Sequence, residues 1–314
     1  MKKKISVISG CYNEEDNVED LYNAVFAIAD KYPEYEWEQI LIDNCSTDKT
    51  SEVLEKLASK DKRFKAIFNI RNFGHIRSPQ HAILQSTGDA VITLASDLQD
   101  PPELIEKFIQ EWSRGSKVVV AIKEDSDESL LFHLIRTSYY KIVARLSDVD
   151  LLKNFNGFGL YDREVIEHIR SFEDPYPYFR GMISELGYPP TRVNYKQEKR
   201  KRGFSKNNLY TLYDVGMLGF TNHTKIPLRL AMFVGFAISI LLFICGLGYL
   251  VAKLFFWNSF QLGTAPVILG LFFIGAVQLM FLGIIGEYIG AIQTRQLKRP
   301  LVVEKRRLNL PPLK

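Results

Sequence analysis

Two long apolar stretches in the last third of this chain, Leu230–Ala252 and Leu262–Ile285, constrain its fold more than any other feature. Each holds roughly the 20 residues that an α-helix needs to cross about 30 Å of hydrocarbon. Lys253 is the only charged residue in the loop between them. Runs of this length without internal charge are rare in water-soluble domains, so the sequence predicts a membrane hairpin. We therefore expect the chemistry of the chain to take place against a lipid surface.

Basic residues gather on the two outer flanks of the hairpin, whereas the short loop Phe255–Gln261 has none. Lys253 can extend along the helix surface to the far interface. Because positively charged flanks stay in the cytoplasm, the sequence predicts that both termini are cytoplasmic. The flanking residues are Arg200, Lys201, Arg202, Lys206, Lys225 and Arg229 on one side and Arg295, Lys298, Arg299, Lys305, Arg306 and Arg307 on the other.

The first half of the chain alternates short β-rich runs with amphipathic helical runs. This alternation predicts an α/β domain with a mainly parallel sheet and helices on both faces. We expect a cytoplasmic α/β domain over residues 1–204, an amphipathic interfacial segment over 205–228, a transmembrane hairpin over 229–290 and a basic cytoplasmic tail over 291–314. The predicted strands are Ile5–Ser9, Gln39–Asp43, Phe64–Asn69, Ala90–Ala95 and Val118–Lys123, and the predicted helices are Val18–Tyr32, Ser51–Ser59, Pro79–Ser86 and Pro102–Arg114.

Several familiar types of site are missing from the sequence. Cys11, Cys45 and Cys245 stand singly, so we expect free thiols rather than disulfides or a zinc site. None of the five histidines belongs to an H-E-x-x-H pattern, and no G-x-G-x-x-G follows the first strand. The net charge of +4, with basic residues beside the hairpin, suits anionic lipid head groups better than nucleic acid.

Polar residues follow the predicted strands, and parallel strands bring their carboxyl ends to one edge of a sheet. Asp97 and Gln99 come after the fourth strand, and such oxygen ligands suit Mg²⁺ or Mn²⁺ together with phosphate oxygens. The alternative is a plain turn between strand and helix, with Asp100 as the N-cap. Asp43 can accept hydrogen bonds from a nucleobase or ribose, and Tyr12 can stack on a base. Together these positions predict a nucleotide-diphosphate pocket.

Six motifs stand in order along the chain: Tyr12-Asn13-Glu14-Glu15, Asp43 with Ser46-Thr47-Asp48, Arg71-Asn72-Phe73-Gly74, Asp97-Leu98-Gln99-Asp100-Pro101-Pro102-Glu103, Gly286-Glu287-Tyr288-Ile289-Gly290 and Arg299-Pro300. The first four resemble the motifs of family 2 inverting glycosyltransferases with a GT-A fold. The last two resemble the polyprenyl-phosphate branch, which includes dolichol-phosphate mannose synthase and bactoprenol glucosyltransferases. The resemblance covers nearly the whole chain.

This resemblance implies a Rossmann-like domain that moves a sugar from a nucleotide donor onto polyprenyl (undecaprenyl) phosphate. UDP is the favoured nucleotide and GDP the next. The reaction would take place on the cytoplasmic face of the bacterial inner membrane, by a multi-pass protein.

The resemblance also implies roles for individual residues. Asp97 and Gln99 would be the catalytic pair that holds Mg²⁺ or Mn²⁺ on the diphosphate. Arg200, Arg202 and Lys206 would bind the acceptor phosphate, although the same basic cluster can be a solvated charge run. The donor would be held by Tyr12, Asn13, Glu14, Asp43, Ser46, Asn72 and Asp97.

Three positions depart from the family pattern. Ala95-Ser96-Asp97 stands where Asp-x-Asp is usual, Asn156-Gly157-Phe158-Gly159-Leu160 stands where Gly-Asp-Phe-Arg-Leu is usual, and Gly10 replaces a common proline. One acidic group, a proposed catalytic base and an arginine are therefore missing. An acceptor phosphate with a second pKa of about 6 is already largely dianionic at pH 7, so it needs little from a base. We expect single displacement with inversion and no covalent sugar–enzyme intermediate.

Two rival functions follow from the same sequence. A processive polysaccharide synthase also joins such a domain to membrane helices, but the Q-x-x-R-W motif of that class is absent. A catalytically silent membrane scaffold or subunit would explain the residues Ala95, Gly157 and Gly159. The hairpin leaves room for packing between copies, and hence a homo-oligomer, through Gly246, Gly248, Gly270 and Gly275.

Overall fold

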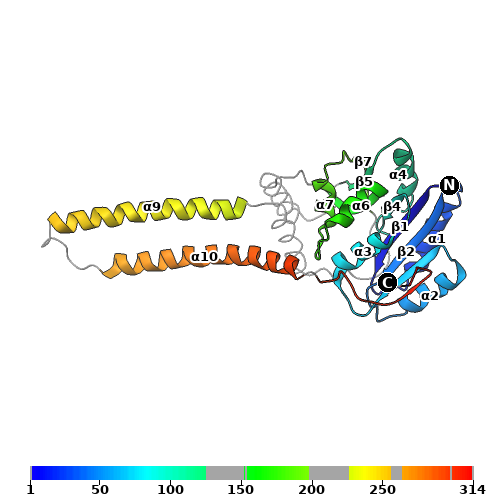
Figure 1. The fold of residues 1–314 in the computed structure, drawn as a ribbon, viewed down its shortest axis with the longest axis horizontal. Coiled ribbons are helices and arrows are strands. Elements are labelled where there is room, and N and C mark those ends of the chain that lie inside the picture. The colour runs from blue at the N-terminus through cyan, green and yellow to red at the C-terminus, as the bar shows by residue number, and fades with distance from the viewer. Residues whose placement is uncertain are drawn as a thin grey trace.

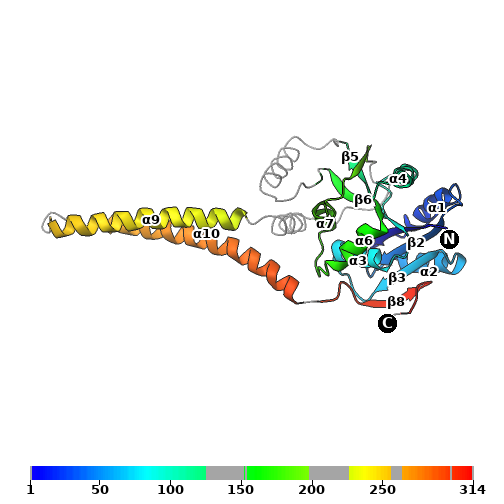
Figure 2. The same cartoon turned by 45° about the horizontal axis from the view of Figure 1, so that its top comes forward.

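The structure is a computed structural model that describes residues 2–124, 152, 154–197, 226–255, 264–297 and 299–312. Within these residues it places one α/β domain beside a pair of long helices that project from it (Figure 1). The domain is built on an eight-stranded sheet with the strand order β7-β5-β6-β4-β1-β2-β3-β8. Figure 2 shows the same arrangement from a second direction.

The centre of the sheet is parallel, as the sequence predicted. It consists of β1 (Lys4–Cys11), β2 (Glu36–Asp43), β3 (Phe64–Asn69) and β4 (Ala90–Thr93). β1 pairs in parallel with β2 and β4, and β2 pairs in parallel with β3. The connecting helices are α1 (Val18–Ala29), α2 (Thr50–Lys60), α3 (Gly74–Gln85) and α4 (Leu104–Ser113). The predicted fifth strand is β5 (Val118–Lys123), so this part of the prediction is confirmed.

Strands that the sequence analysis did not predict complete the sheet. β6 (Phe155–Asp162) lies antiparallel between β4 and β5, and β7 (Thr191–Tyr195) pairs in parallel with β5. The helices α6 (Arg163–Ser171) and α7 (Phe179–Glu185) lie between β6 and β7 in the chain. The sheet is therefore mixed. The strands β1, β2, β3 and β4 run parallel to one another, and β6 runs antiparallel to its neighbours β4 and β5.

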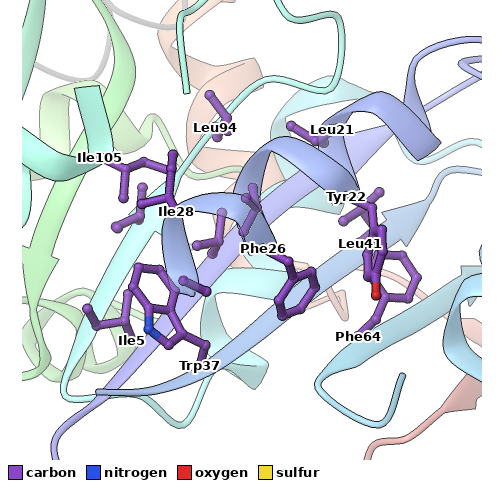
Figure 3. Packing of buried hydrophobic residues seen from close by; sticks show 14 of the residues in the cluster. Ile5, Leu21, Tyr22, Phe26, Ile28, Trp37, Leu41, Phe64, Leu94 and Ile105 are labelled. Atoms are coloured by element: carbon purple, nitrogen blue, oxygen red, sulfur yellow. The ribbon is translucent and has the colours of Figure 1, made fainter. Parts of the chain in front are cut away.

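The strands alternate their side chains between two hydrophobic layers, as the pleat of a β-strand requires. One layer packs α1, α2 and α4 on the sheet, and the other packs α3, α6 and α7 on the opposite face. In β2, Leu41 joins the first layer while Ile40 and Ile42 join the second. Figure 3 shows part of the first layer, in which Phe26 of α1 belongs to the same cluster as Trp37 and Leu41 of β2.

The two long helices are α9 (Ile226–Phe255) and α10 (Thr264–Gln296), which pack on each other and extend away from the domain (Figures 1 and 2). α9 contains the first predicted span, and α10 covers the second from Thr264 onward. Large apolar side chains stay exposed on both helices, including Phe236 (68%) and Leu271 (69%). Among the described residues, one window, Phe273–Gly290, is long and apolar enough to cross a membrane by length and composition, and none of it is buried.

The C-terminal tail returns to the domain and adds a strand to the sheet. β8 (Glu304–Leu308) pairs antiparallel with β3 at the sheet edge (Figure 2). The Glu304 carboxylate is nearly enclosed and lies 2.6 Å from His81 Nε2 of α3, with Arg307 as a second partner. The predicted basic tail is therefore part of the domain, and α10 extends beyond residue 290 to Gln296.

Some predictions fall on residues that the structure does not describe. These are the acceptor cluster Arg200, Arg202 and Lys206 and almost all of the interfacial segment 205–228. They remain predictions. Of the three cysteines, Cys11 and Cys45 are free thiols, as predicted.

Candidate active site

A cleft of about 620 Å³ opens at the carboxyl edge of the central strands. Its floor comes from the ends of β1, β4 and β6, and its walls come from α3 and from the start of α7. Ligands in open α/β sheets bind at this edge, because the loops there diverge. The polar and charged residues that line the cleft include Glu14, His75, Gln80, Ser96, Asp97, Asp100, Asn156, Tyr178 and Arg180.

Asp97 stands at the end of the cleft where β4 passes into a tight turn. Its Oδ1 accepts a hydrogen bond of 3.2 Å from the backbone N–H of Gln99, and Leu98 between them has φ of 55°. Such a left-handed conformation is uncommon for a residue other than glycine, and it is often found at functional sites. Ser96 Oγ donates to the Gly10 carbonyl at 3.0 Å, which ties the turn to β1.

Asp100 does not cap the following helix, contrary to the plain-turn interpretation. α4 begins with Glu103 at its N-cap and has no side-chain cap. The Asp100 carboxylate instead lies buried at the cleft wall, where it accepts hydrogen bonds from Tyr195 Oη at 2.5 Å and Asn156 Nδ2 at 2.9 Å. Burial, together with the negative charge of Asp97, raises the pKa of this carboxyl above its ordinary value.

The loops after β1 and β2 are joined by side-chain hydrogen bonds. The Asn13 backbone N–H donates to Ser46 Oγ at 2.9 Å, and Asn13 Oδ1 accepts from the Thr47 N–H at 2.8 Å. Asn13 has φ of 57°, a conformation that asparagine tolerates better than most residues. Glu14 donates its backbone N–H to Thr50 Oγ1 at 2.9 Å. These contacts fix the rim of the cleft above β1 and β2.

Asp43 is buried at the end of β2, and neighbouring hydroxyl groups surround it. Its Oδ1 accepts from Ser46 Oγ at 2.5 Å, and its Oδ2 accepts from Ser51 Oγ at 2.7 Å. Only 2% of the residue is exposed. In this arrangement the Asp43 carboxylate holds the loop after β2.

Asparagine side chains shape the loop after β3. Asn44 Nδ2 donates to Asn72 Oδ1 at 2.8 Å, and Asn44 Oδ1 accepts from the Phe73 N–H at 2.8 Å. Asn72 Oδ1 also accepts from the Gly74 N–H at 2.8 Å. Asn72 therefore orients the start of α3, which forms one wall of the cleft.

The structure brings together only part of the predicted site. Asp97 and Glu14 line the cleft. The remaining predicted donor and metal residues lie outside its lining, on the loops beside it: Tyr12, Asn13, Asp43, Ser46, Asn72 and Gln99.

Most residues of the lining were not predicted as site residues, among them Asp100, Asn156 and Arg180. Asn156 and Arg180 lie on elements that the sequence analysis did not predict, β6 and α7. The fold brings these elements to the cleft through long-range pairing. The position of Asp100 beside Asp97 was the one local signal.

The two glycines of β6 explain how this chain departs from the family pattern. Gly157 has φ of 106°, a conformation that side chains rarely adopt. A Cβ at Gly159 would lie 2.4 Å from the Val119 carbonyl oxygen and 3.2 Å from Val120 Cα. Because these are backbone atoms of the paired strand β5, the usual arginine does not fit at this position in the observed conformation.

The donor set fits a divalent cation that takes most of its ligands from a substrate. Within the described residues no group of three or more His, Cys, Asp or Glu side chains is placed to hold a metal by itself. Mg²⁺ and Mn²⁺, however, are often held by one or two carboxylates together with phosphate oxygens and water. The half-buried Asp97 at the cleft rim meets this requirement, with Glu14 as a second carboxylate in the lining.

Known proteins resemble this chain over most of its length. The profile described as "Glycosyl transferase family 2" matches residues 6–170. The bactoprenol glucosyl transferase of Shigella phage SfX is 30% identical over 305 residues, which cover 97% of this chain and 99% of that protein. The uncharacterized glycosyltransferase YkcC of Bacillus subtilis (strain 168) is 30% identical over 95% of this chain and 92% of its own length.

Solved structures give a more distant likeness. Glucosyl-3-phosphoglycerate synthase from Mycobacterium tuberculosis, in complex with uridine diphosphate, superposes with a TM-score of 0.48 at 18% identity. The match covers 70% of this chain and 78% of that one.

Proposed function

The chain belongs to glycosyl transferase family 2, and we propose that it moves a single sugar from a nucleotide-sugar donor to a polyprenyl phosphate at the cytoplasmic membrane face. The observation that carries this proposal is the cleft with Asp97 at its rim, in a domain whose chain continues into the exposed apolar helices α9 and α10. The relatives named bactoprenol glucosyl transferases support a lipid-phosphate acceptor.

The nucleoside of the donor would lie beside the cleft, over the loops that follow β1, β2 and β3, with its diphosphate at Asp97 in the lining. The loops that carry Asn13 and Ser46 are already hydrogen-bonded to each other, so this rim is organised before a ligand binds. Such preorganisation lowers the entropy that binding would otherwise cost. We propose Tyr12, Asn13, Glu14, Asp43, Ser46 and Asn72 as the residues that hold the nucleoside, and UDP as the favoured nucleotide.

Asp97, with Gln99 in the same turn, would hold Mg²⁺ or Mn²⁺ at the donor diphosphate. The bound cation would neutralise the charge that develops on the leaving diphosphate. Asp97 follows β4, which lies between β1 and β6 in the sheet. With the nucleoside over β1, β2 and β3, its carboxylate would lie near the bond that must break.

The reaction would be a single displacement with inversion. The acceptor phosphate oxygen forms a bond to the anomeric carbon while the bond from that carbon to the diphosphate oxygen breaks, and the electron pair leaves with the nucleoside diphosphate. A phosphate monoester is largely dianionic at pH 7, so no proton has to be removed from the nucleophile. The loss of the usual acid at Gly157 is compatible with this chemistry, because alignment of the two reactants and neutralisation of the leaving diphosphate need no general base.

We further propose that α9 and α10 are two membrane spans with both termini in the cytoplasm. Each helix is longer than the roughly 20 residues that a bilayer requires. β8 follows α10 and pairs with β3 of the N-terminal domain, which requires the two ends of the hairpin to lie on the same side. The protein would then reside in a bacterial inner membrane, in which copies could also associate through α9 and α10.

The direct test is turnover by the purified full chain with UDP-sugars and GDP-sugars, Mg²⁺ or Mn²⁺ and undecaprenyl phosphate. We expect one sugar per lipid, with the anomeric configuration inverted relative to the donor. A long polymer would indicate a processive synthase, and retained configuration would contradict single displacement. Absence of turnover with every donor would favour the silent scaffold that the residues Ala95, Gly157 and Gly159 suggest.

Asp97→Ala should lower this turnover by about 100-fold or more, since removal of one preorganised charge at such a site typically has this effect. Asp20→Ala on the exposed face of α1 is the matched control and should turn over like the native chain. Near-normal rates for Asp97→Ala would contradict the assignment of the metal.

A further inference from the structure

Arg180 is a cation in the cleft that no step of the proposed function has used so far. It is the second residue of α7 and lies half-buried in the cleft lining. Its Nη1 donates a hydrogen bond of 3.2 Å to the Phe155 carbonyl of β6, and its guanidinium lies 5.3 Å from the ring centroid of Tyr178. The side chain is thus held from two sides, and the remaining N–H groups of the fork can serve a ligand.

The charge of Arg180 stands out among the residues around it. Within the described part of the chain, no other arginine or lysine lines the cleft, whereas Glu14, Asp97 and Asp100 are acidic. An anionic ligand would therefore meet three carboxylates, several uncharged polar groups and one guanidinium in the lining. Arginine recognises phosphate by two parallel N–H···O bonds, which a single ammonium group cannot provide.

The order of strands places Arg180 away from the nucleoside. β4, which leads into Asp97, has β1, β2 and β3 on one side and β6 on the other. Arg180 is hydrogen-bonded to Phe155 of β6, on the side of β4 opposite to β1, β2 and β3. A group bound at Arg180 would approach the sugar from the side opposite to the nucleoside.

The location of α7 also fits a ligand that is anchored in a membrane. In both views α7 lies at the end of the domain that faces the helices α9 and α10 (Figures 1 and 2). A lipid phosphate that enters from the hairpin side would meet this wall of the cleft before it reaches Asp97.

We propose that Arg180 binds the phosphate monoester of the lipid acceptor and aligns its oxygen with the anomeric carbon. This inference rests on the proposed function. At Gly159 of β6 the contacts with Val119 and Val120 leave no room for a side chain, and within the described residues the arginine of the lining comes from α7 instead. The acceptor enters as a dianion and becomes a phosphodiester monoanion when its oxygen bonds to the anomeric carbon, so Arg180 gives and takes no proton in the displacement.

Binding of a short prenyl phosphate tests the proposal without any need for turnover. The full chain in detergent, with UDP and Mn²⁺, is titrated with farnesyl phosphate and separately with farnesol. Arg180→Ala loses the charge-assisted hydrogen bonds to the phosphate, so the Kd for farnesyl phosphate should rise by about 10- to 100-fold. Farnesol, which has no phosphate, should bind both proteins equally. Arg180→Lys should bind the phosphate with intermediate affinity, because it restores a charge without the fork.

Arg170→Ala serves as the matched control, because Arg170 is exposed on α6 and pairs with Glu167. It should bind farnesyl phosphate like the native chain. UDP affinity should stay within about twofold in all three variants, since the proposed nucleoside site is on the loops after β1, β2 and β3 and includes neither arginine. Equal binding of farnesyl phosphate by the native chain and Arg180→Ala would overturn the proposal, and so would an equal loss of farnesol or UDP affinity.

Turnover then separates this inference from the proposed function. If the native chain transfers sugar and Arg180→Ala raises the KM for lipid phosphate with little change in the KM for donor, both stand. If transfer occurs and the KM for lipid phosphate is unchanged, only the role of Arg180 is wrong. If the native chain transfers no sugar, but Arg180→Ala binds prenyl phosphate more weakly than the native chain does, the phosphate site stands and the proposed function fails.

Discussion

The phenol of Tyr195 donates a hydrogen bond of 2.5 Å to the buried carboxylate of Asp100, although the two residues lie 95 positions apart in the chain. Tyr195 ends β7, and Asp100 follows the turn that carries Asp97. Burial, together with the charge and the hydrogen bond of Asp100, raises the pKa of Tyr195, so the phenol remains the donor. The outer strand of the sheet therefore holds the turn at the rim of the cleft.

Tyr195→Phe should destabilise the domain and slow the chemistry. The substitution removes a partner of a buried carboxylate, which typically costs about 1–3 kcal/mol. The matched control is Tyr188→Phe, whose hydroxyl donates to Glu164 at the surface and should matter little. Thermal unfolding in the same detergent checks this prediction. Equal midpoints for the two variants would show that the contact with Asp100 is unimportant.

Acid should selectively weaken the contacts of Glu38. Burial alone would raise the pKa of this carboxyl, but hydrogen bonds from Lys4, Lys65 and Ser6 outweigh burial and lower it to about 2. A carboxyl with a lowered pKa stabilises the fold above its unfolded pKa and loses that contribution as the pH falls towards the folded value. A decrease of this size corresponds to about 3 kcal/mol at neutral pH.

Glu38→Gln should therefore lower the unfolding midpoint at pH 7, and the gap to the native chain should shrink between about pH 4.5 and pH 2. Glu36→Gln, exposed on the same strand, is the control and should change the midpoint little. A gap for Glu38→Gln that stays constant with pH would contradict the role of its charge.

Restoring a side chain at Gly159 should harm the protein rather than repair it. A Cβ there meets backbone atoms of β5, so Gly159→Ala should cost about 3 kcal/mol through overpacking. Gly159→Arg should reduce the yield of folded protein and should not raise transfer. Gly283→Ala on α10, where a Cβ meets no atom within 4 Å, is the control. A stable and more active Gly159→Arg would refute this prediction.

The pairing of the C-terminal strand β8 with β3 should depend on Glu304. Its carboxylate is nearly buried between His81 and Arg307, and breaking a buried pair typically costs at least about 3 kcal/mol. Glu304→Ala should therefore release β8 and speed tryptic cleavage among Lys305, Arg306 and Arg307. Lys305→Ala, a neighbouring exposed position, should keep the rest of the tail protected. Equal cleavage of both variants would mean that Glu304 does not hold the strand.

The proposed topology predicts the accessibility of engineered cysteines. Ser259→Cys, between α9 and α10, should react with a membrane-impermeant maleimide in intact spheroplasts. Ser59→Cys, on the exposed end of α2, should react only after the membrane is opened. Reaction of Ser59→Cys in intact spheroplasts would place the domain outside the cell and contradict the two-span orientation.

Several elements could be predicted because their signals are local. Each of the first five strands is a short apolar run, and each connecting helix carries an apolar stripe, so nearby residues alone indicate both. The position of Asp97 at the carboxyl edge follows from the same alternation, because parallel strands must bring these ends together. The hairpin helices follow from length and hydrophobicity alone.

β6, β7 and β8 could not be predicted in the same way. β6 contains Gly157 and Gly159, which weaken any strand signal, and β8 is a charged run that reads as a tail. Each becomes a strand only because a partner in the sheet satisfies its backbone hydrogen bonds. The enclosure of Asp43 by Ser46 and Ser51 likewise depends on how the loop after β2 closes.

The sequence by itself determined that a parallel α/β domain with acidic groups at one edge precedes a pair of apolar helices, since periodicity and composition are properties of neighbouring residues. Only the tertiary structure decided which side chains line the cleft. Asp100, Asn156 and Arg180 meet there because β6, β7 and α7 pack against strands far away in the chain. Such long-range contacts arise from the packing of the whole sheet, and no local pattern encodes them.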